Sequence, residues 1–173
     1  EAGKPIRDAF VEVDRASFTF RLGAEEAERM TGEVIPLDLL PASKGRLGIT
    51  RRYPIGPIAA ISPFNFPLNL AVHKIAPAIA TGNPIILKPP SADPLTMLTV
   101  AEIIEAAGVP AGSVSVLPMT RQMGDRMVAD PRFKLLTFTG SPSVGWRMKE
   151  RAGKKKIVLE LGGNAGVIVD KSA

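Results

Sequence analysis

Apolar positions in the first 30 residues recur with the period of an α-helix. They lie three or four residues apart, with charged residues between them: Ile6, Phe10, Val13, Ala16 and Phe20. This spacing predicts an amphipathic helical segment over residues 1–32. Gly23 interrupts the pattern, and we expect it to break the segment or to join two helices.

The pattern changes over residues 33–54, where two short, partly alternating runs flank a loop. The runs fall at 34–37 and 46–52, and the loop between them spans 40–45. They predict two strands, which could pair as a hairpin, without a compact core of their own. We expect such a β arm to need another surface to pack on.

From residue 55 onward, short apolar runs alternate with amphipathic stretches. The runs fall at 58–61, 84–87, 114–117, 135–138, 157–161 and 166–169, and the helical stretches at 67–80, 94–107, 122–129 and 142–152. This alternation predicts an α/β fold with an open parallel sheet and helices on both faces. Ligands of such sheets bind where the strands end, so the loops after the strands are the places to look for function.

Composition excludes several kinds of site. The chain has no cysteine and a single histidine, His73, so disulfides, thiolate metal sites and histidine-cluster metal sites are excluded. The net charge of +5 comes from scattered cations, and aromatic residues make up only 5%. This distribution favours a general surface charge or an anionic small ligand over nucleic acid. No apolar run could span a bilayer and the first residues do not resemble a signal peptide, so we expect no membrane partner and a cytoplasmic location.

One predicted strand runs directly into a helix at residues 138–145. Gly140 permits a tight turn, Ser141 is a good N-cap residue, and Pro142 suits the first helical position. The exposed amides at such a helix start attract anions, including a pyrophosphate. The segment matches neither of the common glycine-rich nucleotide motifs, so a well-capped turn without a ligand remains the alternative.

Three other side chains each allow two interpretations. Lys88 ends a predicted strand, where it could bind a ribose or phosphate or simply face solvent. Asn65 could cap the helix that follows it or donate to a developing oxyanion. Glu160 lies between two leucines, where partial burial would raise its pKa and suit it to general-base work. The alternative for Glu160 is an ion pair with a lysine at 154–156.

Four motifs, in this order, resemble those of the aldehyde dehydrogenase superfamily. They are ISPFNFP at 61–67, IATGNPIILKP at 79–89, FTGS at 138–141 and LELGG at 159–163. The resemblance covers nearly the whole chain. It implies a Rossmann-like cofactor-binding domain that uses NAD or NADP, a small-molecule aldehyde as the substrate of the parent protein, and assembly into a homo-oligomer, as a dimer or tetramer.

The resemblance also divides the chain. It implies a helical segment at 1–32, a β arm for oligomerisation at 33–54, the cofactor-binding domain at 55–163, and the start of a catalytic domain at 164–173. The family's nucleophilic cysteine follows the glutamate motif, and this chain contains none. We therefore expect the chain alone to show weak dehydrogenase activity or none. The alternatives are a non-catalytic nucleotide-binding or assembly module and an unrelated phosphate-binding α/β domain.

Site roles follow from the matching positions. The resemblance implies cofactor binding by residues in the loops after the strands: Ile61, Ser62, Pro63, Phe64, Lys88, Ser91, Gly124, Gly140, Ser141, Val144, Leu161 and Gly162. Ser141 would meet the pyrophosphate, and Lys88 would hold the adenosine ribose. Asn65 would donate to the oxyanion that develops when the family's cysteine attacks the aldehyde. Glu160 would activate the water that hydrolyses the thioester formed on that cysteine. We expect Gly140, Ser141, Lys88 and Asn65 to line one crevice.

Two positions depart from the family's pattern. Ser91 stands where members that prefer NAD often carry a glutamate, so this chain is expected to accept the 2′-phosphate of NADP. Arg121 follows a proline-containing loop in which the family often has a glycine. Its guanidinium could meet a phosphate or face solvent.

Overall fold

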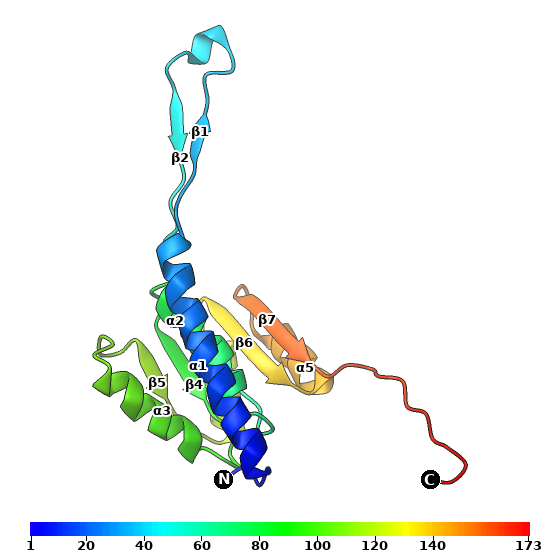
Figure 1. Ribbon diagram of the computed structural model, residues 1–173. Coiled ribbons are helices and arrows are strands. Elements are labelled where there is room, and N and C mark those ends of the chain that lie inside the picture. The colour runs from blue at the N-terminus through cyan, green and yellow to red at the C-terminus, as the bar shows by residue number, and fades with distance from the viewer.

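A five-stranded parallel sheet forms the centre of the protein, whose computed structural model describes residues 1–173 (Figure 1). Its strands are β3 (Ile58–Ile61), β4 (Ile85–Lys88), β5 (Val114–Val116), β6 (Leu135–Gly140) and β7 (Lys156–Leu161). They lie in the order β5-β4-β3-β6-β7. The chain thus builds outward from β3 in one direction and then returns to place β6 on its other side. The carboxyl ends of β3 and β6 therefore form the topological switch point, where such sheets bind ligands.

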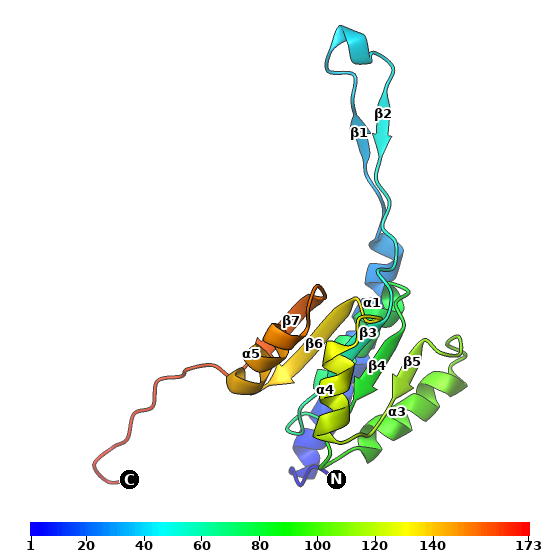
Figure 2. The same cartoon turned by 180° about the vertical axis from the view of Figure 1, so that it is seen from behind.

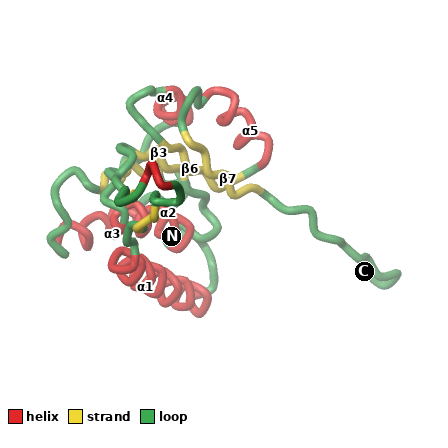
Figure 3. The backbone as a smooth tube through the Cα atoms, turned by 90° about the horizontal axis from the view of Figure 1, so that it is seen from above, coloured by secondary structure: helices red, strands yellow, loops and turns green.

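Helices cover both faces of the sheet, as the alternation of runs predicted. One face carries α2 (Asn69–Ala80) and α3 (Leu95–Ala106), with α1 (Ile6–Arg29) packed outside α2. The other carries α4 (Arg121–Ala129) and α5 (Pro142–Arg151). Figure 2 shows α4 in front of the strands, and Figure 3 shows the helices separated by the sheet. The predicted Rossmann-like architecture is confirmed.

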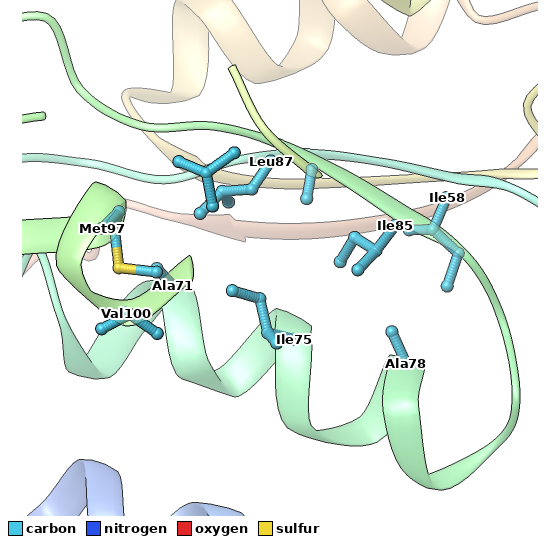
Figure 4. Close-up of a cluster of buried hydrophobic side chains, with 10 residues drawn as sticks. Ile58, Ala71, Ile75, Ala78, Ile85, Leu87, Met97 and Val100 are labelled. Carbon is cyan, nitrogen blue, oxygen red and sulfur yellow. The ribbon is translucent and has the colours of Figure 1, made fainter. Parts of the chain in front are cut away.

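Alternating side chains of the strands divide the core into two clusters. On β3, Ile58 and Ala60 pack toward α2 and α3, whereas Ala59 and Ile61 pack toward α4 and α5. The first cluster includes Ile75 and Leu87 and is drawn in Figure 4. Because β3 is buried on both faces, its run of four apolar residues has no polar position.

Gly23 does not break the first helix, contrary to the sequence-based expectation. The helix α1 continues from Ile6 to Arg29 and lies along α2. A Cβ at Gly23 would be 3.4 Å from the Cβ of Ala76. A glycine weakens a helix by about 1 kcal/mol relative to alanine. The packing of α1 along α2 stabilises the continuous helix in spite of that loss.

The predicted β arm is a hairpin that projects away from the sheet (Figure 1). Strand β1 (Val34–Pro36) pairs antiparallel with β2 (Leu47–Ile49), and the 3-10 turn η1 (Pro41–Ser43) lies between them. Its apolar side chains are exposed, including Leu39 and Leu40. The two strands and the lack of a core are confirmed, and the function of the arm in assembly stays a prediction.

The sixth strand expected at 166–169 is not formed. These residues belong to a segment after β7 without helix or strand, which leads away from the sheet (Figure 1). Ile168 is 98% exposed. An apolar run becomes a strand only when a neighbouring strand accepts its hydrogen bonds, and no strand lies beside this one. None of the helices has the length and hydropathy of a bilayer-spanning segment.

Candidate functional site

A cleft of about 1260 Å³ lies on the α2 side of β6 and β7. The loop after β3, the helices α1 and α2, and the ends of the two strands line it. Several predicted site residues meet there: Pro63, Phe64, Asn65, Gly140, Ser141, Glu160, Leu161 and Gly162. Segments far apart in the sequence thus converge next to the switch point of the sheet.

Strand periodicity explains the polar floor of this cleft. On β6, Leu136 and Phe138 pack into the core beneath α4 and α5, so Thr137 and Thr139 face the opposite side. The register pairs Thr139 with Glu160, which therefore shares that face. Helix α2 lies over β3 and β4, and on the same face of β7 the side chain of Val158 is exposed.

Lys74 is the residue of this cleft that the sequence did not reveal. It lies on α2 and is only 6% exposed. Its Nζ donates to Oγ1 of Thr137 at 3.1 Å and to Oγ1 of Thr139 at 2.8 Å. Burial lowers the pKa of Lys74 to about 8, and the charge of Glu160 partly opposes that shift. A group with this pKa can accept and release a proton near neutral pH.

A signal for Lys74 exists in the sequence, although it is weak alone. The residue interrupts the apolar stretch of α2 and takes a position on the face that packs against the sheet. A lysine there is expected to be paired or to have a specific task. Its partners on β6 lie more than 60 residues away in sequence, so the pattern could not identify them.

Basic groups gather at the α1 side of the cleft. His73 precedes Lys74 and lines the cleft. Partial burial lowers the pKa of His73, and the nearby charges of Arg15 and Lys74 lower it further. Arg15 lies one helical turn before Thr19, another lining residue, so both belong to the same side of α1.

Glu160 is exposed in the cleft, so the partial burial expected from its two leucine neighbours is wrong. The leucines belong to the opposite face of β7, because successive side chains of a strand alternate. No ion pair joins Glu160 to a lysine at 154–156, and that alternative is also wrong. Its function as a general base stays a prediction.

Asn65 lines the cleft but does not cap the helix that follows it. The first free amides of α2, those of Leu68 and Asn69, each donate to Oε1 of Glu12 at 2.9 Å. A carboxylate from α1 therefore provides the cap, and the capping alternative for Asn65 is wrong. The side-chain amide of Asn65 has no hydrogen bond to the protein and remains available to a ligand.

The turn from β6 into α5 has the predicted geometry, with one exception. Ser141 occupies the N-cap position and Pro142 the first helical position, but the Ser141 side chain forms no capping hydrogen bond. Its hydroxyl and the first amides of α5 are therefore free. A Cβ at Gly140 would lie 2.5 Å from Cζ of Phe138, so only glycine fits without moving that ring.

Lys88 does not line this cleft, so the expectation of one crevice for all four residues is wrong. On β4, Ile85 and Leu87 face α2 and α3, and alternation turns Lys88 toward α4. Lys88 is 8% exposed, which excludes an ordinary solvent-facing lysine. Its Nζ donates to the carbonyl of Pro89 at 3.3 Å. A Cβ at Gly124 would lie 3.2 Å from its Cδ.

The residues around Lys88 form a second group at the edge of the sheet, with Ser91, Arg121 and Gly124, and this group is positively charged. Burial lowers the pKa of Lys88, and the neighbouring charge of Arg121 lowers it further. Ser91 is exposed three residues beyond Lys88. The group therefore presents two cations without a carboxylate at position 91.

The other predicted cofactor residues have different surroundings. Ile61 and Val144 pack in the core beneath α4 and α5. Ser62 is 4% exposed, and its buried hydroxyl has no hydrogen-bond partner. An unsatisfied buried hydroxyl at the end of β3 is consistent with a ligand nearby.

Comparison with known proteins agrees with these features. The model of the aldehyde dehydrogenase family matches residues 1–173. The 3-sulfolactaldehyde dehydrogenase of Priestia aryabhattai is 43% identical over 174 residues, which cover 100% of this chain and 36% of that protein. The lactaldehyde dehydrogenase of Methanocaldococcus jannaschii is 47% identical over 178 residues, which cover 100% and 37%. The chain thus spans about a third of the length of the curated relatives it matches.

Solved structures agree on the fold. Aldehyde dehydrogenase 21 from Physcomitrella patens, in complex with its reaction product succinate, superposes with a TM-score of 0.90 at 55% identity, over 95% of this chain and 34% of that one. The glyceraldehyde-3-phosphate dehydrogenase GapN from Methanocaldococcus jannaschii, in complex with NADP, gives a TM-score of 0.86 at 48% identity, over 94% and 35%. Since the family model spans every residue, the chain belongs to the aldehyde dehydrogenase family.

Proposed function

We propose that the chain binds a nicotinamide dinucleotide and forms the cofactor-binding part of an enzyme that oxidises an aldehyde to a carboxylic acid. The observation that carries this proposal is the free helix start at Ser141, which opens beside a cleft containing Asn65 and Glu160. A helix start with unoccupied amides binds a pyrophosphate well. The nicotinamide, when bound, supplies the acceptor for the hydride that leaves the substrate.

The residues present suit a ligand as long as a dinucleotide. Lys88 and Gly124 lie on the α4 side of the sheet, whereas Asn65 and Glu160 belong to the cleft on the α2 side. The turn at Ser141 lies between these faces. An adenosine beside Lys88 and a nicotinamide in the cleft would place the diphosphate that joins them at this turn.

Within the cleft, the chain's own side chains suit two tasks. The amide of Asn65 would donate to the oxygen of the substrate carbonyl as negative charge develops there. The carboxylate of Glu160 would accept a proton from water. Lys74 lies close enough to Glu160 for their charges to interact, and its pKa of about 8 would let it exchange that proton.

Calorimetric titration with NAD and NADP tests this proposal by binding, because the chain has no cysteine to act as the nucleophile. We expect both dinucleotides to bind and NADP to bind more tightly, because the charges of Lys88 and Arg121 act on each other and a serine, without charge, stands three residues after Lys88. Ser91→Glu should lower the affinity for NADP about tenfold through charge repulsion with the 2′-phosphate. The control Ser17→Glu adds the same charge on an exposed position of α1. Absence of binding heat with either dinucleotide would refute the proposal, and tighter binding of NAD would refute the preference.

We further propose an aldehyde with an anionic group as the substrate of the parent enzyme. Lys74 provides positive charge in the cleft, and the charge of Arg15 acts on His73, another residue that lines it. Similar proteins include a 3-sulfolactaldehyde dehydrogenase and a glyceraldehyde-3-phosphate dehydrogenase, and the structure of aldehyde dehydrogenase 21 holds its reaction product succinate. Such a group would be held by charge-assisted hydrogen bonds.

Succinate serves as a probe of this anionic subsite. We expect NMR shifts on titration to map to the cleft and Arg15→Met to weaken binding about tenfold, the value of one charge-assisted hydrogen bond. Arg21→Met, which removes another exposed arginine of α1, is the matched control. Equal binding by the two variants would contradict the assignment of Arg15.

The arm formed by β1 and β2 supports assembly into a homo-oligomer, as a dimer or tetramer. Its strands have free edges and exposed apolar side chains such as Val34 and Ile49. A second subunit would cover both.

A cytoplasmic location and the absence of nucleic-acid and membrane partners remain predictions from composition. If no dinucleotide binds, an assembly module becomes the better hypothesis.

A further inference from the structure

Glu12 is a buried carboxylate that the proposed chemistry does not use. It lies on α1 and is 4% exposed. Its Oε1 accepts both amides at the start of α2, and its Oε2 pairs with the ammonium of Lys4. A buried carboxylate is tolerated only when such partners replace water. The side chain therefore joins the N-terminal segment to the helix that carries Lys74.

The loop ahead of α2 depends on anchors from outside itself. Between Ser62 and Leu68 the backbone amides of Phe64, Asn65 and Phe66 form no hydrogen bond within the protein, and the other two residues are prolines without an amide hydrogen. Asn65, which faces the cleft, is the middle residue of this loop. The backbone is tied only at the two ends of the loop, where the Ser62 amide donates to the carbonyl of Lys88 at 3.4 Å and the Phe66 carbonyl accepts from the Leu70 amide at 3.1 Å.

Glu12 and Lys4 supply two anchors for that loop. Glu12 fixes its end at Leu68, three residues after Asn65. The ammonium of Lys4, held by Glu12, lies 4.1 Å from the centroid of the Phe66 ring, which follows Asn65 directly. A cation over a ring and a carboxylate at a helix start are both attractive contacts. Both anchors lose their geometry if the Glu12 carboxylate is removed.

We propose that Glu12 is a positioning residue, which holds the loop after β3 so that Asn65 faces the cleft. The claim that this position of Asn65 helps a reaction rests on the function proposed above. The position itself follows from contacts within the chain and does not depend on that function.

NMR of the 173-residue chain tests the proposal directly. Glu12→Ala should speed hydrogen exchange of the Leu68 and Asn69 amides about tenfold or more and should make the backbone of Asn65 more mobile. Glu12→Gln keeps an acceptor oxygen and should restore most of the order. Glu25→Gln, which changes an exposed carboxylate of the same helix, should alter neither readout.

The outcomes separate positioning from general stability. If Glu12→Ala lowers the melting temperature while Asn65 stays as ordered as before, the carboxylate stabilises the fold only and the proposal is wrong. If Glu12→Ala does not fold, Lys4→Met decides, because it removes the contact with Phe66 and should loosen Asn65; unchanged order would again overturn the proposal. A failed dinucleotide titration leaves these readouts intact, so the two proposals fail separately.

Discussion

Replacing Lys74 by methionine is expected to change how the stability of the fold depends on pH. The pKa of Lys74 falls from 10.5 to about 8 on burial. Below pH 8 the lysine is charged in the folded and unfolded states alike, so the full penalty of burying the charge is present. Between pH 8 and 10.5 only the folded state has lost its proton, so the unsubstituted chain gains stability as pH rises. Above 10.5 both states are neutral and the penalty is gone.

The shift corresponds to about 3 kcal/mol at 1.36 kcal/mol per pKa unit. Urea unfolding at pH 7 and pH 10.5 measures the free energy of unfolding of Lys74→Met minus that of the unsubstituted chain. This difference should fall by about this amount between the two pH values. The hydrogen bonds to Thr137 and Thr139 are lost at both, so they do not affect the comparison. Lys154→Met, at an exposed turn, serves as the control. An equal difference at both pH values would contradict the burial of a charge at Lys74.

Replacing Gly140 by alanine is expected to lower both stability and dinucleotide affinity. The added Cβ would lie 2.5 Å from Cζ of Phe138, whose ring is 5% exposed and packs in the cluster beneath α4 and α5. Since the ring has little room to move, we expect a loss of about 2 kcal/mol in the free energy of unfolding, the usual result of overpacking a core. The turn at Ser141 would shift with the ring, and dinucleotide affinity should fall about tenfold.

Gly163→Ala is the matched control for Gly140→Ala. No atom lies within 4 Å of a Cβ at Gly163, and its backbone needs no positive φ. Thermal unfolding and calorimetric titration of both variants measure the two effects. Normal affinity in a destabilised Gly140→Ala would show that the turn does not bind the diphosphate.

Lys74 combines a buried position with the nearby charge of Glu160. A methionine would fill the same space without a charge, whereas the lysine keeps a titratable group next to Glu160. Groups whose pKa is displaced toward neutrality are common at sites of proton transfer.

The sequence by itself determined the elements and their layers. Runs such as Ile58–Ile61, separated by amphipathic stretches, determine strands and helices because periodicity is a local property of the chain. The turn at Ser141 and Pro142 could be predicted for the same reason, since capping depends on adjacent residues. The run at 166–169 is an instructive error, because a strand needs a neighbour that the local pattern does not contain.

Only the tertiary structure decided which side chains meet. It turned Lys88 away from Asn65, placed Lys74 against Thr137, and brought Glu12 to the start of α2. The two contacts join residues that are 56 to 63 positions apart in sequence. Lys88 and Asn65 are kept apart because their side chains point to opposite faces of the sheet. The close crossing at Gly23 likewise depends on a second helix. Contacts across such distances follow from packing of the whole sheet, so the local pattern of the chain does not encode them individually.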